Sequence, residues 1–162
     1  RRARLTEYAA EKATATYHEG SVWTYAGNYD IALPCATQNE INGEAAKRLV
    51  AQGVICVSEG ANMPSDLDAI KVYKENGIFY GPAKAANAGG VAVSALEMSQ
   101  NSLRLSWTRE EVDGRLKDIM TNIFNTAKTT SETYGLDKDY LAGANIAAFE
   151  NVANAMIAQG IV

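Results

Sequence analysis

The chain has 162 residues, of which 47% are apolar and 21% charged, and its formal net charge at neutral pH is −4. That balance is typical of a globular domain with one ordinary core, and it excludes an intrinsically disordered chain. The basic residues are scattered, and no apolar run reaches the roughly 20 residues of a membrane helix, so we expect neither a nucleic acid nor a membrane as partner.

The first half of the chain alternates between predicted helices and short apolar strands. Residues 2–13 have helical spacing, and because the sequence opens inside this helix without an initiator Met, we expect a fragment of a longer polypeptide. Strands are predicted over residues 29–35, 54–58 and 78–82, with helices between them that begin at the N-caps Asn42 and Ser65. Such alternation implies right-handed crossovers and a parallel sheet. We therefore expect the α/β class, with the second half of a doubly wound, Rossmann-like sheet.

From residue 83 onward the pattern is helical only. One long helix is predicted over residues 83–107, and Thr108 with Glu111 forms a capping box that begins the next helix. A last helix is predicted over residues 140–159. The expected division is therefore residues 1–82 for the sheet and residues 83–162 for a long helix and the C-terminal helices.

The thiols and the single imidazole do not form a reactive pattern. Cys35 and Cys56 lie in or beside apolar runs, and we expect both to be reduced thiols in the core. His18 lies in a loop-like stretch that suits a surface side chain. One histidine and two separated cysteines do not match the spacing of a zinc site, so we expect no metal.

Polar residues follow the first two predicted strands, at the sheet edge where doubly wound folds bind their ligands. Thr37, after the first strand, suits sugar hydroxyls or a nicotinamide carboxamide, although a loop that caps the next helix explains it equally. After the second strand, Asn62 suits a ribose or an amide and Glu59 a ribose, although a tight turn accounts for both. The residues alone leave these alternatives open.

Two adjacent glycines, Gly89 and Gly90, lie in the early turns of the predicted helix over residues 83–107. Each costs roughly 1 kcal/mol relative to alanine in a helix interior, so either a ligand or a packed helix should explain them. Helical geometry places Asn87, Val91 and Ser94 on one face, where the helix N-terminus favours a carboxylate-bearing ligand. Lys84 is interpreted as a solvated lysine at the helix start.

Together these segments resemble one known family. Residues 30–40, 59–64 and 83–94, supported by residues 97–101 and 143–146, resemble the hexameric, bacterial and fungal type of NADP-dependent glutamate dehydrogenase. The resemblance covers nearly the whole chain. Each motif is weak by itself, but their combination in this order is specific.

The resemblance implies a reversible, NADP-dependent oxidative deamination of L-glutamate to 2-oxoglutarate and ammonia. It also implies a cytoplasmic homohexamer that serves nitrogen assimilation, with the active site in a cleft between two domains. By motif match, Thr37 and Asn62 border the nicotinamide-side ribose, and Asn87 contacts the nicotinamide or its ribose. Ser94 binds the distal carboxylate of glutamate, and Val91 packs against its methylenes.

The resemblance also implies what this chain lacks. The family's catalytic lysine and aspartate, and its glycine-rich phosphate turn, lie upstream of Arg1, so we expect no catalytic residue here. The groups that separate NADP from NAD lie there too, which leaves NAD as an alternative cofactor. Two other functions remain open: a non-catalytic module that binds nucleotide or self-associates, and a dehydrogenase of leucine, phenylalanine or valine. The polar Ser94 favours glutamate over an apolar substrate.

Overall fold

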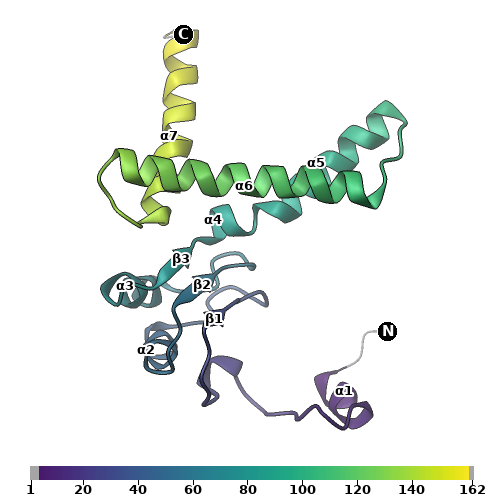
Figure 1. Cartoon of the computed structure of the whole chain (residues 1–162), viewed down its shortest axis with the longest axis vertical. Coiled ribbons are helices and arrows are strands. Elements are labelled where there is room, and N and C mark those ends of the chain that lie inside the picture. Colours follow the sequence, from purple (N-terminus) through teal and green to yellow (C-terminus); the bar gives the residue numbers. More distant parts are fainter. Residues whose placement is uncertain (1–3, 161–162) are drawn as a thin grey trace.

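The computed structural model describes residues 4–160 as a small parallel sheet followed by long helices (Figure 1). The elements, in chain order, are α1 (Leu5–Glu11), η1 (Val22–Thr24), β1 (Ile31–Ala32), α2 (Gly43–Ala51), β2 (Cys56–Ser58), α3 (Leu67–Glu75), β3 (Phe79–Gly81), α4 (Ala83–Ala86), α5 (Ala88–Leu103), α6 (Arg109–Thr133) and α7 (Tyr140–Gln159). Helix α1 lies apart from the sheet at the end of an extended connection, and α6 runs across the carboxyl side of the strands (Figure 1).

The sheet is parallel, as predicted. Its strands are ordered β1-β2-β3 and are all parallel, with Ala32 paired to Val57 and Val57 to Tyr80. This confirms the α/β class and the parallel sheet with helices between its strands. The strands are shorter than predicted, and β1 ends at Ala32 rather than near residue 35. Pro34 has no N–H for the ladder, and its carbonyl accepts instead from the N–H groups of the loop after β2.

Helices α2 and α3 cover only one face of this sheet (Figure 1). Because side chains alternate across a strand, one row of the sheet is buried in the core beneath these helices; it comprises Ala32, Val57 and Tyr80. The opposite face carries apolar side chains that are 42–59% exposed in this chain; they are Ile31, Leu33 and Phe79. The packed face therefore fixes the strand ends, while the other face is open.

Side-chain caps set most helix starts. The Asn42 side chain accepts from the Ala45 N–H, as predicted, and Thr108 and Glu111 form the predicted capping box of α6. Helix α3 is capped by Asp66 and not by Ser65, so that prediction is wrong by one residue. The reason is that Ser65 is buried, and its hydroxyl lies 3.2 Å from that of Tyr73.

The predicted single helix over residues 83–107 is wrong. It is divided at Asn87 into the one-turn helix α4 and the helix α5, which ends at Leu103. Arg104 adopts a left-handed conformation with φ 56°, and the Leu105 N–H returns to the Gln100 carbonyl, which closes α5 in a Schellman turn. The break at Asn87 redirects the chain from the sheet toward α6.

Helices α6 and α7 cross at very close range. A Cβ at Gly143 would overlap the Ala127 carbonyl oxygen and lie 3.1 Å from the Ser131 Cβ, so only glycine permits this crossing. A salt bridge of 2.7 Å between Lys74 and Asp139 joins α3 to the start of α7. Within residues 4–160, every helix is too short or too polar to cross a bilayer.

Candidate functional site

Two loops at the carboxyl ends of β1 and β2 form one rigid unit. We call them the first strand-end loop, residues 33–42, and the second strand-end loop, residues 59–66. The Asn39 N–H donates to the Met63 carbonyl at 2.9 Å, and both residues adopt left-handed conformations, with φ of 54° and 46°. Non-glycine residues held in this region are uncommon and cluster at functional sites. The loops therefore have the character of a binding edge.

Further contacts lock the loops together. The Gly60 and Ala61 N–H groups donate to the Pro34 carbonyl at 2.9 and 3.0 Å. A Cβ at Gly60 would lie 2.5 Å from the Cys35 Sγ, so this glycine serves the contact between the loops. Both cysteines are free, but Cys35 is exposed and Cys56 half-buried, so the prediction that both lie in the core is wrong. Cys35 follows the buried Pro34 and, by alternation, points to the open side.

Glu40 holds the first strand-end loop in shape. Its Oε1 accepts from the Ala36 and Thr37 N–H groups at 2.9 and 3.2 Å, and its Oε2 accepts from the Trp23 indole at 2.8 Å. Hydrogen bonds to an ionised acceptor are about twice as strong as neutral ones. Thr37 is thereby held exposed at the loop tip. Since Asn42 caps α2, helix capping is not the role of Thr37.

The structure brings Asn62 and Asn87 together. Asn87 Nδ2 donates to Asn62 Oδ1 at 2.6 Å and to the Ala61 carbonyl at 3.1 Å. Both donor hydrogens of Asn87 are thus engaged, while its Oδ1 remains as an acceptor and the Asn62 amide nitrogen as a donor. A neutral donor beside a neutral acceptor matches a ribose hydroxyl or a carboxamide. The two residues come from separate motifs, so this pairing is a result of the fold.

Glu59 is structural and does not offer an oxygen to a ribose. Only 2% of the residue is exposed, its Oε1 accepts from the Ser65 N–H at 3.2 Å, and its Oε2 accepts from the Ala83 N–H at 2.8 Å. Burial raises the pKa of the neighbouring Tyr73 to about 12. Burial, followed by the hydrogen bond to Glu59, also raises the pKa of Tyr80. Both phenols are therefore neutral at physiological pH.

The two adjacent glycines have different roles. A Cβ at Gly89 would lie 3.3 Å from Leu116 Cδ1 and 3.4 Å from Met120 Sδ, so this position serves packing against α6. A Cβ at Gly90 would meet no atom within 4 Å. Helix packing therefore explains one glycine, and the other leaves the backbone of α5 open to whatever approaches its exposed face.

Val91 and Ser94 lie on that exposed face of α5. Val91 is 72% exposed, and the Ser94 hydroxyl, also exposed, donates to the Gly90 carbonyl at 3.3 Å. The expected face is only partly retained, because Asn87 precedes α5 and turns toward Asn62. Lys84 is exposed as expected, but it is not simply solvated, since its ammonium donates to the Asn145 side chain of α7.

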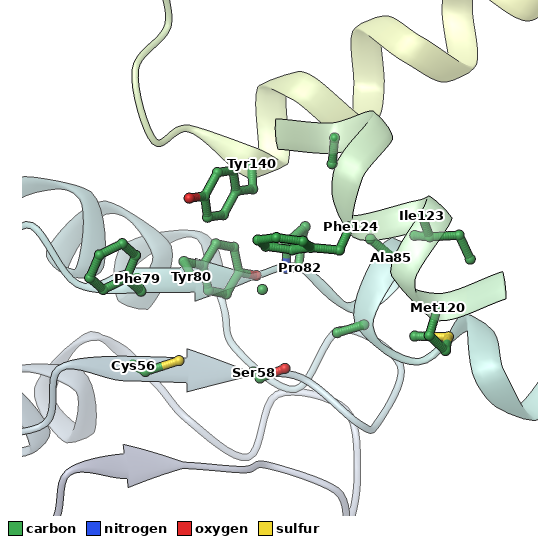
Figure 2. Close-up of a pocket in the computed structure, with 13 residues that line it drawn as sticks. Cys56, Ser58, Phe79, Tyr80, Pro82, Ala85, Met120, Ile123, Phe124 and Tyr140 are labelled. Carbon is green, nitrogen blue, oxygen red and sulfur yellow. The ribbon is translucent and has the colours of Figure 1, made fainter. Parts of the chain in front are cut away.

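An apolar cavity is lined by none of these polar side chains. This cavity of about 470 Å³ lies between the open face of β2 and β3 and helices α4, α6 and α7. Figure 2 shows Phe79, Tyr80, Pro82, Phe124 and Tyr140 around it, with Ser58 and Cys56 at its floor. It contains no charged side chain, so it suits hydrocarbon and not a dicarboxylate.

The polar residues fit part of a cofactor. The neutral amides of Asn62 and Asn87 suit a nicotinamide riboside, and no glycine-rich phosphate cradle accompanies them in this sequence. Within the described part of the chain, no group of three or more His, Cys, Asp or Glu side chains has the arrangement of a metal site.

Sequence signals explain only part of this site. The motifs with Thr37, Asn62 and Asn87 were identified, whereas the roles of Glu40 and Trp23 were missed. A glutamate within a strand-end loop, with no basic residue nearby in sequence, is the available signal that its carboxylate binds backbone N–H groups.

Comparison with known proteins identifies one family. A family model described as Glutamate/Leucine/Phenylalanine/Valine dehydrogenase matches residues 1–160. The NADP-specific glutamate dehydrogenase of Giardia intestinalis is 52% identical over 164 residues, which cover 100% of this chain and 36% of that protein. The NAD(P)-specific glutamate dehydrogenase of Xylanibacter ruminicola is 53% identical over 162 residues, which cover 99% of this chain and 36% of that protein.

A solved structure of a relative has the same fold. Glutamate dehydrogenase from Plasmodium falciparum superposes with a TM-score of 0.93 at 48% identity, covering 99% of this chain and 34% of that chain. The chain thus spans about a third of the length of the relatives it matches. The fold and the motifs agree with these matches over nearly every residue, and the chain belongs to the Glutamate/Leucine/Phenylalanine/Valine dehydrogenase family.

Proposed function

We propose that this chain forms the nicotinamide-side and glutamate-side walls of a glutamate dehydrogenase. The reaction is the reversible oxidative deamination of L-glutamate to 2-oxoglutarate and ammonia. The observation that carries this proposal is the Asn62–Asn87 amide pair at the strand ends, beside the exposed face of α5. Relatives near 50% identity that are named glutamate dehydrogenases support the activity. They do not favour the alternative of a non-catalytic module.

The proposed cofactor is NADP, which accepts hydride from the substrate at its nicotinamide ring. Asn62 and Asn87 hold the ribose and carboxamide by the donor and acceptor left outside their mutual hydrogen bond. Thr37 borders the ribose from the tip of the first strand-end loop. NAD remains the alternative, since one relative is named NADP-specific and another NAD(P)-specific.

The proposed substrate side is the exposed face of α5. Ser94 donates its hydroxyl to the distal carboxylate of glutamate, exchanging its weak bond to the Gly90 carbonyl for one to a charged acceptor. Val91 packs against the substrate methylenes. An apolar substrate tail would leave the Ser94 hydroxyl desolvated without a new partner, which disfavours leucine, phenylalanine and valine.

The rest of the relatives' length supplies the remaining parts in this proposal. The catalytic lysine and aspartate, and the phosphate-binding turn, belong to sequence outside residues 1–162. The open face and the β1 edge of the sheet are covered by that same sequence, because exposed apolar strands otherwise promote association. The assembly is a cytoplasmic homohexamer that serves nitrogen assimilation.

Ser94→Ala tests the substrate side of this proposal in the complete polypeptide that carries residues 1–162. A hydrogen bond to a charged group contributes about 1.5–3 kcal/mol, so the KM for glutamate should rise at least about tenfold while that for NADP stays constant. Ser99→Ala is the matched control, because Ser99 makes the same bond to its own helix, to the Ala95 carbonyl at 2.9 Å. An unchanged glutamate KM in Ser94→Ala would refute the role of Ser94.

A further inference from the structure

A single buried carboxylate joins the two segments that carry the amide pair. Glu59 lies directly after β2, and its Oε1 accepts from the Ser65 N–H at the end of the second strand-end loop. Its Oε2 accepts from the N–H of Ala83, the first residue of α4, at 2.8 Å. One side chain therefore connects the loop with Asn62 to the helix that ends at Asn87.

The chemistry of this connection requires a carboxylate. Glu59 is 2% exposed, and an ionised carboxylate in such a place is stable only when hydrogen bonds satisfy it. The Ser65 and Ala83 N–H groups each donate to one of its oxygens. Glutamine has the same shape but only one acceptor oxygen, so its NH₂ group would face an N–H donor. The two backbone donors therefore demand two acceptor oxygens.

The connection through Glu59 also bears on the distance between Asn62 and Asn87. Asn62 comes three residues after Glu59, and Asn87 comes four residues after Ala83, so both spans are short and leave little slack. Across them the two amides meet at 2.6 Å. A shift of α4 relative to the loop would separate this pair before it affected the core beneath α2 and α3.

We propose that Glu59 is a positioning residue that fixes the spacing of Asn62 and Asn87, and so presents the amide pair to the nicotinamide riboside. The proposal rests on the proposed function, since it assigns Glu59 to the cofactor side of that site. Glu59 touches no cofactor atom in this account. It acts only through the two segments whose N–H groups it binds.

Glu59→Gln tests the assignment in the complete polypeptide, with the Kd for NADPH measured by its fluorescence and the KM for glutamate by turnover. Misplacement of binding groups by about 1 Å can cost up to about 100-fold, so we expect the NADPH Kd to rise at least about tenfold. The glutamate KM should stay within about twofold of wild type, since Ser94 and Val91 keep their helix.

Ser131→Ala is the control for a purely structural effect. Ser131 is fully buried near the C-terminal end of α6 and donates to the Asp137 carbonyl. It should lower the melting temperature without changing the NADPH Kd. An unchanged Kd in Glu59→Gln, or equal losses of cofactor and glutamate binding, would overturn the positioning role. Absence of glutamate-dependent NADP reduction in the wild type would instead overturn the proposed function.

Ala83→Pro keeps the proposal testable if Glu59→Gln does not fold. It deletes only the N–H that binds Glu59 Oε2, at the first helical position, where proline is favoured. Pro82, at φ −68° and ψ 146°, already has the extended conformation that a residue before proline adopts. The NADPH Kd should again rise while the glutamate KM does not, and an unchanged Kd would contradict the proposal.

Discussion

The two regions of the molecule are held together in different ways. Residues 29–82 enclose nearly all of the hydrophobic core, with Ile41, Ala46 and Tyr73 fully buried. Along α5, α6 and α7, by contrast, the buried positions within the described residues are Ala127, Ser131 and Gly143. The first region is thus stabilised by packing, and the second by a few close contacts between otherwise exposed helices.

This difference divides the proposed site. Thr37 and Asn62 lie on loops that backbone hydrogen bonds and the carboxylates of Glu40 and Glu59 hold rigid. Ser94 lies on a helix whose position depends on the contacts of α6. The cofactor side is therefore preorganised within this chain, whereas the substrate side depends on how the helices are held. Asn87 lies at the junction of the two.

Gly143→Ala should give the largest loss of stability, because it disrupts the crossing of α6 and α7 that holds the second region together. The new Cβ would overlap the Ala127 carbonyl, and overpacking against backbone costs about 3 kcal/mol. Hydrogen exchange of the complete polypeptide should show faster opening of α6 and α7 with unchanged protection of α2 and α3.

Gly114→Ala is the matched control on α6. A Cβ there meets no atom within 4 Å, so better helix propensity should stabilise by up to about 1 kcal/mol. Equal loss of protection in α2 and α3 after Gly143→Ala would contradict the separation of the two regions.

Asp139→Asn should give a smaller loss of stability, because it weakens the salt bridge with Lys74 that joins the two regions. The Asp139 side chain caps α7 and binds Lys74. Burial alone would raise the pKa of this carboxyl group. The hydrogen bonds from Lys74 and the Ala142 N–H outweigh burial and lower the pKa. Asparagine keeps the cap and loses the charge, which should cost about 0.5–1 kcal/mol for a partly exposed pair.

The difference in unfolding free energy between wild type and Asp139→Asn should depend on pH in one direction. Because the folded pKa of Asp139 is lowered from 3.8, its contribution is complete above that pH and disappears as pH falls through the folded value. Urea unfolding should therefore separate wild type from Asp139→Asn at pH 7, and the difference should shrink as the pH falls below 3.8. A difference that grows as the pH falls would show that Lys74 does not stabilise the carboxylate.

Much of the fold follows from local chemistry. The parallel sheet, the Asn42 cap, the capping box at Thr108 and the last helix from Tyr140 to Gln159 were all predicted, because caps and apolar periods act within a few residues. The division of the chain at residues 82 and 83 remains a proposal.

The sequence predictions fail where the local structure depends on residues that are distant in the sequence. Residues 83–94 have helical composition throughout, and the break at Asn87 comes with a hydrogen bond to Asn62, 25 positions earlier in the chain. The role of Glu59 was left open between a ribose contact and a tight turn, because its hydrogen bonds to the Ser65 and Ala83 N–H groups form only in the fold. Local patterns located the polar segments of the site, but not the carboxylates that position them.

A crystal structure of the complete polypeptide with NADP bound would show directly whether the amide pair holds the cofactor. We predict that ribose or carboxamide atoms lie within about 3.2 Å of Asn62 Nδ2 and Asn87 Oδ1, while the hydrogen bond between the two residues is retained. A nicotinamide riboside bound away from both asparagines, with their amides unchanged, would contradict it.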